Sequence, residues 1–480
     1  MSKALVSDAS VELFACGKWT KSASRSPVVD KFSGAVVGEV ASASAADVAR
    51  AVAACAEAFR AGPPPPHKRA DILHRASQLV ADRAPSLAAT IVAESGFTHA
   101  DANGEVSRCV QTLIASAAEA RRFDEGEVVP LSGAPGQEGR LGFTLRVPIG
   151  PVAAITPFNS PLNTVAHKLA PAFAAGNPVL LKPSGYTPLT AALLVQVLLD
   201  AGVPENFIAY LPGSGGVVGP ALLAQQAVRF FTFTGSTEVG RRIQTAAGLR
   251  RTQLELGSIA FTIVMPDADL DRAIPLIASA SFRKAGQVCT SIQVLLVHGS
   301  IRDEVEQRLA DQTRSMPCGD NRKPETVVGP MIAEQEAERA QDWVTRAREA
   351  GARAVLGGER SGSLLQPTIL ADVPVDALVL TDEIFAPVVS IVPFSSFETA
   401  IDSVNATPYG LATGVFTRDI ERALQAARAL HVGGVHINNT CSSRVDLMPY
   451  GGVKDSGFGR EGPRYAMREM SEERLVTITP

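Results

Sequence analysis

One cysteine stands in a setting that suits a reactive thiol. Cys289 lies in the stretch AGQVCTS at 285–291, between an expected helix and a strand that begins near Ile292. Small polar neighbours keep such a loop open, so the sulfur could reach a cleft and, as the thiolate, attack an electrophilic carbon. The alternative is a buried structural thiol, which is the usual role of free cysteine. The local sequence favours neither interpretation over the other.

Polar side chains also stand at the ends of short apolar runs that are typical of buried strands. They are Asn159 after 152–155, Lys182 after 179–181, Gly235–Ser236 after 229–234, and Glu255 within 253–256. Each has an ordinary explanation, as a loop residue, a helix cap or a solvent-facing strand position. In an open parallel sheet, however, ligands bind at the carboxyl ends of the strands, and a helix N-terminus favours an anion. The joint placement therefore favours a ligand site.

Two common nucleotide-binding motifs are missing from the positions where they would bind a nucleotide. No G-x-G-x-x-G follows a strand, and no G-x-x-x-x-G-K-[ST] occurs. The ordinary Rossmann fingerprint and the P-loop are therefore excluded.

The elements that position these residues alternate regularly along the chain. Short apolar strands separated by helices predict a parallel sheet with both faces covered. The first series has runs at 152–155, 179–181, 208–211, 229–234 and 253–256, and the second has runs at 292–297, 388–392, 411–416 and 435–437 among helices near 269–285, 301–314, 333–350 and 419–430. An earlier helix begins at Ser44, which caps it with Asp47, and ends at 62–66, with Cys55 on its apolar face.

Composition fits a globular protein and excludes several classes. The chain has 480 residues, 46% of them hydrophobic, and a formal net charge of −4, so no basic field is available for nucleic acid or an anionic membrane. The six cysteines form no C-x-x-C pair, which suggests neither a disulfide framework nor a metal site. The start of the chain lacks the apolar core of a signal peptide, and no apolar run could span a bilayer. We expect a cytoplasmic location.

Two segments belong to neither series of strands. Residues 142–146, at the end of a Gly- and Pro-rich stretch from 124, alternate like an exposed strand, and residues 475–478 resemble a lone strand. Lone strands leave backbone donors unpaired. We expect a neighbouring subunit to pair them.

Eight stretches in register make the sequence resemble the aldehyde dehydrogenase superfamily, in particular the branch of lactaldehyde and phosphonoacetaldehyde dehydrogenases. They are TPFNSPLN at 156–163, KPS at 182–184, FTGSTEVG at 233–240, LELGS at 254–258, GQVCTS at 286–291, DEIFAPV at 382–388, PYGLATGVFT at 408–417 and PYGGVKDSGFGREG at 449–462.

The resemblance implies an α/β fold with two Rossmann-like parallel-sheet domains and a small β oligomerisation segment. Residues 1–123 and 147–256 would form the cofactor-binding domain, 257–448 the catalytic domain, and 124–146 with 463–480 the oligomerisation segments of a homodimer or homotetramer.

The resemblance also implies the reaction. Cys289 would be the nucleophile, while the Asn159 amide and the Cys289 backbone N–H would hold the oxyanion. Glu255 would be the general base that hydrolyses the thioester. The product of this NAD- or NADP-dependent oxidation would be a carboxylic acid. The implied cofactor residues are Lys182 on the adenosine ribose, Gly235 and Ser236 on the pyrophosphate, Glu383 on the nicotinamide ribose with Phe385 beside it, and Thr156, Pro157 and Ser184.

Some positions depart from the family. Many NAD-preferring relatives carry Glu where this chain has Gly185, so we hypothesise that NADP is accepted at least as well as NAD. Ile259 replaces a residue that is often polar, which questions the geometry of the loop after Glu255. Arg108 and Arg444 are candidates for an anionic substrate group, against the alternative that they are ordinary helix and loop charges.

The substrate is expected to be a small hydroxylated or anionic aldehyde, with Ser160 also near it. Val288 and Ser160 argue against an anion, because relatives that bind anions can carry Arg or larger polar residues there. Alternatives for the function are a CoA-acylating enzyme, which Glu255 disfavours, and a non-catalytic binding or assembly protein, which the set of Asn159, Glu255 and Cys289 disfavours. Reduction of glutamate phosphate is disfavoured by LELGS and EIFAPV.

Overall fold

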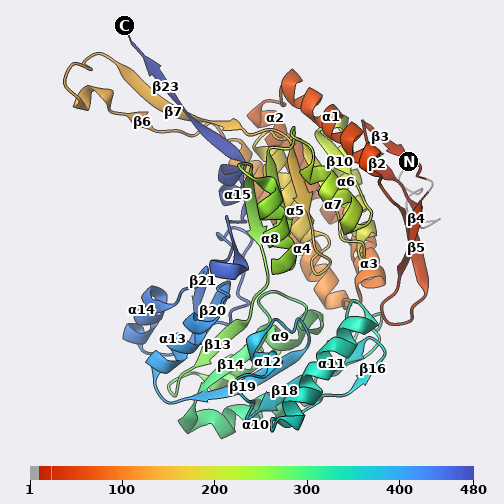
Figure 1. The fold of residues 1–480 in the computed structure, drawn as a ribbon, viewed down its shortest axis with the longest axis vertical. Helices are drawn as coiled ribbons and strands as arrows, with labels where there is room; N and C mark the ends of the chain where they lie inside the picture. The colour runs from red at the N-terminus through yellow and green to blue at the C-terminus, as the bar shows by residue number, and fades with distance from the viewer. Residues whose placement is uncertain (1–9, 23, 480) are drawn as a thin grey trace.

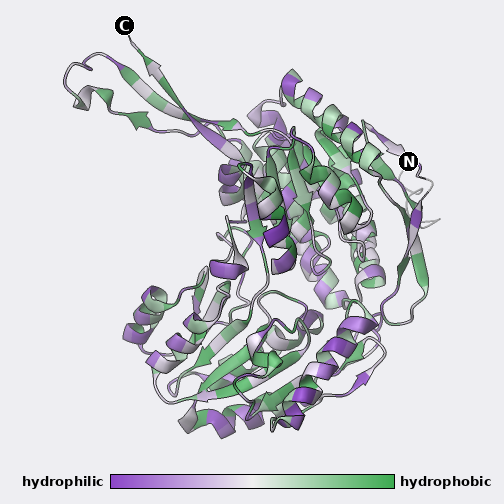
Figure 2. Cartoon of the chain, in the orientation of Figure 1, coloured by the Kyte–Doolittle hydropathy of each residue, from purple (hydrophilic) through white to green (hydrophobic). Residues whose placement is uncertain are grey.

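The computed structural model describes residues 10–22 and 24–479, which form two α/β lobes and a projecting ribbon (Figure 1). Hydrophobic residues lie along the sheets and polar residues on the outer helices such as α11 (Glu334–Glu349), as Figure 2 shows. No described helix is both long enough and apolar enough to cross a bilayer.

The first lobe is built on an eight-stranded sheet of order β22-β12-β11-β8-β9-β10-β2-β3. Its strands are β2 (Leu13–Ala15), β3 (Lys18–Thr20), β8 (Val152–Ile155), β9 (Val179–Lys182), β10 (Ile208–Tyr210), β11 (Phe230–Thr234), β12 (Arg251–Glu255) and β22 (Gly457–Phe458). The strands from β12 to β10 run parallel, and β2 and β22 join antiparallel at the two sides. This confirms the parallel sheet that the first series of apolar runs predicts.

Two helical layers cover this sheet because successive strand residues face opposite sides. Val152 and Ala154 pack with one layer, and Ala153 and Ile155 pack with the other. The first layer contains α2 (Pro66–Asp82), α3 (Ala84–Ser95), α4 (His99–Ala120), α5 (Asn163–Ala174), α6 (Pro188–Ala201) and α15 (Pro463–Glu469), and the second contains α1 (Ala45–Ala61), α7 (Gly215–Leu223) and α8 (Thr237–Ala247). The Ser44–Asp47 capping box of α1 and the burial of Cys55 are confirmed.

The second lobe has a seven-stranded sheet of order β15-β18-β19-β14-β13-β20-β21. Its strands are β13 (Ala260–Val264), β14 (Ile292–His298), β15 (Arg353–Leu356), β18 (Thr368–Ala371), β19 (Val388–Phe394), β20 (Ala412–Phe416) and β21 (Gly434–Ile437). All neighbours are parallel except β15 with β18. Helices α9 (Leu270–Phe282), α10 (Arg302–Arg314), α11 and α12 (Leu378–Thr381) pack on one face, and α13 (Phe397–Ala406) and α14 (Ile420–Ala429) on the other.

The two strands expected to be unpaired in the chain pair with each other, which corrects that expectation. Strand β7 (Leu141–Pro148) lies antiparallel to β23 (Ser471–Ile478) along their whole length, and β6 (Val128–Val129) adds to β7. The partners are far apart in sequence, so local patterning could not reveal them. The ribbon projects from the first lobe (Figure 1), whereas the preceding helix α15 packs into that lobe's core through Ala466 and Met467.

Smaller β elements complete the described chain. Strands β1 (Ser10–Val11), β4 (Arg25–Val29) and β5 (Val36–Ala41) form a three-stranded sheet beside the first lobe, and β16 (Arg360–Ser361) pairs with β17 (Leu364–Leu365) in the second.

Candidate active site

A cavity of about 1310 Å³ lies between the two lobes. The strand order explains its position, because β8 neighbours β9 on one side and β11 on the other. The connections that lead from β8 to β9 and from β11 to β12 therefore run toward opposite edges of the sheet. Open α/β sheets bind ligands in the crevice at such a topological switch point. The backbone register aligns Ile155 with Lys182 and Thr234 with Glu255, which brings the strand ends together.

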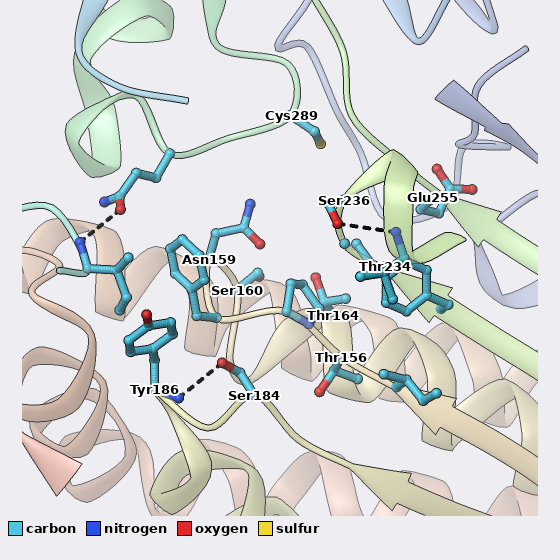
Figure 3. Close-up of a pocket in the computed structure, with 18 of the residues that line it drawn as sticks. Thr156, Asn159, Ser160, Thr164, Ser184, Tyr186, Thr234, Ser236, Glu255 and Cys289 are labelled. Carbon is cyan, nitrogen blue, oxygen red and sulfur yellow. Dashed lines mark hydrogen bonds between the residues drawn. The ribbon is translucent and has the colours of Figure 1, made fainter. Parts of the chain in front are cut away.

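The loop after β8 forms the wall next to the sulfur. Thr156, Pro157, Asn159 and Ser160 all line the cavity, and the Asn159 amide points into it from the side facing Cys289 (Figure 3). The Asn159 carbonyl accepts a hydrogen bond of 2.8 Å from Lys284 Nζ. The loop that carries the amide is thereby tied to the loop that carries the cysteine.

The cysteine loop has a tight, left-handed backbone. The expected helix to 285 ends at Phe282, and Lys284, Ala285 and Gly286 have φ of 53°, 51° and 68°. A Cβ on Gly286 would lie 2.1 Å from the Ala386 carbonyl oxygen, so only glycine allows this close packing.

Lys284 also anchors the loop from the opposite side. Its ammonium lies 2.8 Å from Glu105 Oε2, while Glu105 Oε1 accepts the backbone N–H groups of Leu162 and Asn163 at the start of α5. A buried ion pair thus fixes the nucleophile loop against the helix that follows Asn159.

Cys289 is partly exposed in the cavity, which decides between the two interpretations of this thiol. Its Sγ lies 2.8 Å from the Tyr450 hydroxyl. Burial raises the pKa of the Cys289 thiol to about 11, although Tyr450 and Arg444 oppose the shift. The thiol is therefore protonated at neutral pH in the protein alone and needs a base or additional positive charge to ionise.

Glu255 ends β12 inside the same cavity and is 3% exposed. Neither of its carboxyl oxygens has a hydrogen-bond partner among the described residues. Burial and, next, the charge of Glu461 raise the pKa of Glu255 well above its usual value, while Lys168 and Arg444 act in the opposite direction. A buried carboxyl with free oxygens and a raised pKa is suited to accept a proton.

Near Glu255 lies a set of paired charges, in which sequence reasoning named Arg444 but missed Lys168 and Glu461. Glu461 accepts hydrogen bonds from Lys168 at 3.0 Å and from Arg444 at 2.9 Å. Burial would raise the pKa of Glu461, but Lys168 and Arg444 lower it to about 2. The lysine and the carboxylate are 293 residues apart in sequence, and no local pattern connects them.

The distal end of the cavity is suited to a dinucleotide. Ser236 caps α8, and Gly235 is required because a Cβ there would lie 2.5 Å from the Phe233 ring. The N-terminal amides of α8 therefore border the cavity at the place where a pyrophosphate would be stabilised.

Lys182, Ser184 and Gly185 line the same end. Burial lowers the pKa of Lys182 to about 8, and the Ser184 hydroxyl accepts the Tyr186 backbone N–H at 3.2 Å. A Cβ at Gly185 would meet nothing within 4 Å. The space that a carboxylate would take at this position is open.

The second lobe contributes Glu383 and Phe385. Glu383 Oε1 accepts the Ser258 backbone N–H at 2.9 Å, and burial raises the pKa of Glu383 to about 7. The Phe385 ring meets the Phe158 ring edge to face, with centroids 5.9 Å apart. Ile259 is buried in the second lobe's core, and Glu255 keeps its place in the cavity wall.

Five arginines of the described chain line the cavity, and three of them, Arg108, Arg444 and Arg283, differ in their partners. Arg108 donates to both oxygens of Asp446, at 3.2 and 2.7 Å, and Arg444 pairs with Glu461. Arg283, which sequence reasoning missed, donates to the Ser442 hydroxyl at 2.7 Å and has no carboxylate partner among the described residues. Burial lowers the pKa of Arg283. The sequence signal that could have identified Arg283 is its closeness to the candidate nucleophile, since it lies six residues before Cys289.

One cavity thus contains a cysteine thiol, a carboxyl with no hydrogen-bond partner in the described chain, and an end suited to a dinucleotide. This combination is typical of one enzyme family. The aldehyde dehydrogenase family matches residues 19–476, and the chain belongs to it. A 3-sulfolactaldehyde dehydrogenase from Priestia aryabhattai is 43% identical over 466 residues, which cover 97% of each chain.

Two solved structures are similar over nearly the whole chain. Aldehyde dehydrogenase 21 from Physcomitrella patens, in complex with the reaction product succinate, has a TM-score of 0.95 and 35% identity over 98% of this chain and 99% of that one. Glyceraldehyde-3-phosphate dehydrogenase from Methanocaldococcus jannaschii, complexed with NADP, has a TM-score of 0.91 and 36% identity over 95% and 99%.

These comparisons confirm the fold and the enzyme class that the resemblance implies. The protein is an NAD(P)-dependent aldehyde dehydrogenase. Among the described residues, no cluster of His, Cys, Asp or Glu could hold a metal ion.

Proposed function

We propose that this enzyme oxidises a small anionic aldehyde to its carboxylic acid through a thioester on Cys289. The observation that carries the proposal is that Cys289, Asn159 and the unpaired Glu255 line one cavity, together with the residues suited to a dinucleotide. In this arrangement residues 1–123 and 147–256 bind the cofactor and residues 257–448 form the catalytic domain.

The first half of the reaction forms the thioester. The Cys289 thiol first gives its proton to the Glu255 carboxylate, which passes it to solvent. The thiolate then bonds to the aldehyde carbon, and the carbonyl electron pair moves to oxygen. The Asn159 side-chain amide and the Cys289 backbone N–H donate hydrogen bonds to this oxygen, a kind of contact whose loss typically costs about 3–4 kcal/mol of barrier. NAD(P)⁺, when bound, supplies the hydride acceptor that converts the adduct into a thioester.

Cofactor binding uses both lobes. Gly235 and Ser236 would present the α8 amides to the pyrophosphate, and Lys182 would bind the adenosine ribose. Glu383 would accept a hydrogen bond from a hydroxyl group of the nicotinamide ribose. Its neighbour Phe385, together with Thr156, Pro157 and Ser184, completes the walls.

The second half of the reaction needs Glu255. Its carboxylate takes a proton from a water molecule whose oxygen bonds to the thioester carbon. The C–S bond then breaks, its electron pair stays on sulfur, and the carboxylic acid leaves. A transfer to CoA would not require this base, so the free oxygens of Glu255 favour hydrolysis over acylation of CoA.

Arg283 supports the anionic substrate class. A partly buried cation that lines the cavity and lacks a carboxylate partner among the described residues suits a sulfonate, carboxylate or phosphate group, which a guanidinium binds through two hydrogen bonds. The Ser442 hydroxyl beside it can add a third donor. Arg108 and Arg444 add positive charge near it, and Ser160 borders the same space. The three relatives reported above carry names or products with sulfonate, carboxylate and phosphate groups.

The cofactor proposal rests on Gly185. Open space at this position leaves room for a 2′-phosphate and places no negative charge near it. NADP is therefore accepted at least as well as NAD.

The projecting ribbon supports a homo-oligomer, a dimer or a tetramer. Leu475 and Ile478 of β23 are 57% and 51% exposed, and β23 has a free edge among the described residues. Such an edge is usually covered in the working protein. A cytoplasmic location fits a catalytic thiol that must stay reduced.

A panel of aldehydes assayed with NAD and with NADP tests the proposal. Succinate semialdehyde, phosphonoacetaldehyde and glyceraldehyde 3-phosphate should give a higher kcat/KM than lactaldehyde, propanal or benzaldehyde, measured by absorbance of the reduced cofactor. Cys289→Ala should abolish turnover, and mass spectrometry should find an acyl group on Cys289 of the native enzyme. Full activity of the alanine variant, or acyl-CoA formation after CoA is added, would refute the mechanism.

A further inference from the structure

The sulfur of Cys289 has a phenol beside it whose role the reaction described so far does not use. The Tyr450 Oη atom lies 2.8 Å from Cys289 Sγ, and no other side-chain hydrogen bond to this sulfur occurs among the described residues. Tyr450 stands in the segment 449–462, which returns to the first lobe through β22. The phenol therefore reaches the sulfur from an element other than the cysteine loop.

Tyr450 is held in place by a closed set of contacts. Its backbone N–H donates to the Glu461 carbonyl at 3.1 Å, and the Glu461 N–H donates back at 2.7 Å. The Glu461 carboxylate pairs with Arg444, whose guanidinium carbon lies 3.8 Å from the centre of the Tyr450 ring. Backbone, carboxylate and cation thus fix the ring, and the hydroxyl position relative to the sulfur follows from them.

The direction of this hydrogen bond follows from the surrounding charges. Burial holds the pKa of the Tyr450 phenol well above its usual value, so the hydroxyl stays protonated at neutral pH. When the sulfur is an anion it can only accept, and the phenol must donate. The titratable and charged groups that face this pair are Glu255, Arg283, Glu383, Cys441 and Arg444.

We propose that Tyr450 is a catalytic residue that donates its hydroxyl hydrogen bond to the Cys289 thiolate, with Arg444 and Glu461 as its positioning residues. The sulfur carries negative charge twice in each cycle, before it attacks the aldehyde and when the thioester C–S bond breaks. The same donor therefore stabilises the nucleophile and the leaving group. This role rests on the proposed thioester chemistry, although the hydrogen bond itself can be tested without any aldehyde.

The test is alkylation of Cys289 by iodoacetamide in Tyr450→Phe, without cofactor or aldehyde, followed by mass spectrometry from pH 6 to 10. Loss of a hydrogen bond to a charged group should raise the pKa of the thiol by about one unit, which leaves about tenfold less thiolate at each pH. The remaining thiolate gains nucleophilicity, by about threefold for a Brønsted coefficient near 0.4–0.5. We expect a net decrease of about threefold at every pH in this range.

Two further proteins make the result specific. Tyr465→Phe removes the same atom from a helix outside the cavity lining and should react at the native rate. Replacing Tyr450 by 3-fluorotyrosine keeps the ring but makes the hydroxyl a stronger donor, so alkylation should become faster than native. A faster alkylation cannot come from a loss of packing. The 3-fluorotyrosine protein also tests the proposal if Tyr450→Phe does not fold.

Turnover provides the second readout. The kcat of Tyr450→Phe should fall while the Kd for NADPH, measured by fluorescence quenching, stays unchanged. Equal alkylation rates in native, phenylalanine and fluorotyrosine proteins would overturn the role of Tyr450. A Cys289→Ala enzyme that still oxidised aldehydes would instead overturn the proposed function, so the two failures are distinguishable.

Discussion

Two regions around the cavity contain buried or partly buried charges and differ in how these charges are compensated. In the paired region, Glu461 lies between Lys168 and Arg444, and Asp446 lies against Arg108. In the unpaired region, Glu255 has no hydrogen-bond partner and Arg283 no carboxylate among the described residues. The pKa of Glu461 is lowered to about 2 whereas that of Glu255 is raised. Burial alone thus does not decide the protonation state, because partners can reverse its effect.

The difference separates groups that hold the fold from groups that can react. A paired charge is satisfied by the protein and has little to offer a ligand. An unpaired buried group is costly in the empty cavity, and a substrate, a water molecule or a proton can satisfy it. We therefore expect substitutions in the unpaired region to affect turnover most and those in the paired region to affect stability most.

The largest effect is expected at Glu255. In Glu255→Gln, kcat should fall by about 10²- to 10⁴-fold because no base activates water, and a burst of reduced cofactor should precede slow turnover as the acyl-enzyme accumulates. The native kcat should rise with pH as Glu255 ionises through its raised pKa, and the variant should lose this dependence. Stopped-flow absorbance measures both.

Stability should move in the direction opposite to activity. The pKa of the Glu255 carboxyl is higher in the folded state than in the unfolded state, where it is near 4.5. Its contribution to stability is therefore fully present below the unfolded pKa and is lost as pH rises through the folded pKa. In urea unfolding, Glu255→Gln should therefore gain stability relative to the native protein as pH rises above about 4.5. Equal pH dependence in both proteins would place Glu255 in an environment unlike the one described.

The next largest effect is expected when the carboxylate of Glu461 is removed from the paired region. Glu461→Gln leaves Lys168 and Arg444 without their carboxylate, and the free energy of unfolding should decrease by about 3–5 kcal/mol. The kcat profile should shift to lower pH, because burial still raises the pKa of Glu255 but the added contribution of the Glu461 charge is gone. The matched control is Glu473→Gln on the exposed ribbon, where less than about 0.5 kcal/mol is expected.

A smaller effect is expected for Arg283→Met. KM for the anionic aldehydes should rise by about 10- to 100-fold, as for the loss of a hydrogen bond to a charged group, while KM for propanal changes little. The control Arg272→Met, on the exposed side of α9, should resemble the native enzyme. Arg108→Ala should give the same selectivity with a smaller factor, because Arg108 already binds Asp446. An equal increase for propanal would remove the anion-binding role.

The smallest effect is expected for Gly185→Glu. Its side chain would enter open space, so the fold is retained. The added carboxylate should repel a 2′-phosphate and lower kcat/KM for NADP by about tenfold relative to NAD. A native enzyme that already prefers NAD strongly would contradict the NADP proposal.

The order of apolar runs was sufficient to predict the two parallel sheets, because strand and helix periodicities are local properties. The motifs pointed to Cys289, Glu255, Asn159 and the proposed cofactor residues, and the structure brings these residues to the lining of one cavity. The expectation that two strands lack a partner within the chain was wrong, because β7 and β23 pair with each other. Local patterning could not reveal this pairing, since the two strands are separated by more than 300 residues. Pairing over that distance is decided by the closed fold.

What the sequence determined by itself is which groups could react, because the type of a residue fixes its chemistry. Only the tertiary structure decided which of those groups are free to react. Arg444 and Arg283 are the same residue type in the same cavity, yet Arg444 is paired with Glu461 whereas Arg283 has no carboxylate partner among the described residues. The physical reason is that compensation of a buried charge depends on neighbours brought from other segments of the chain, such as Glu461 beside Lys168.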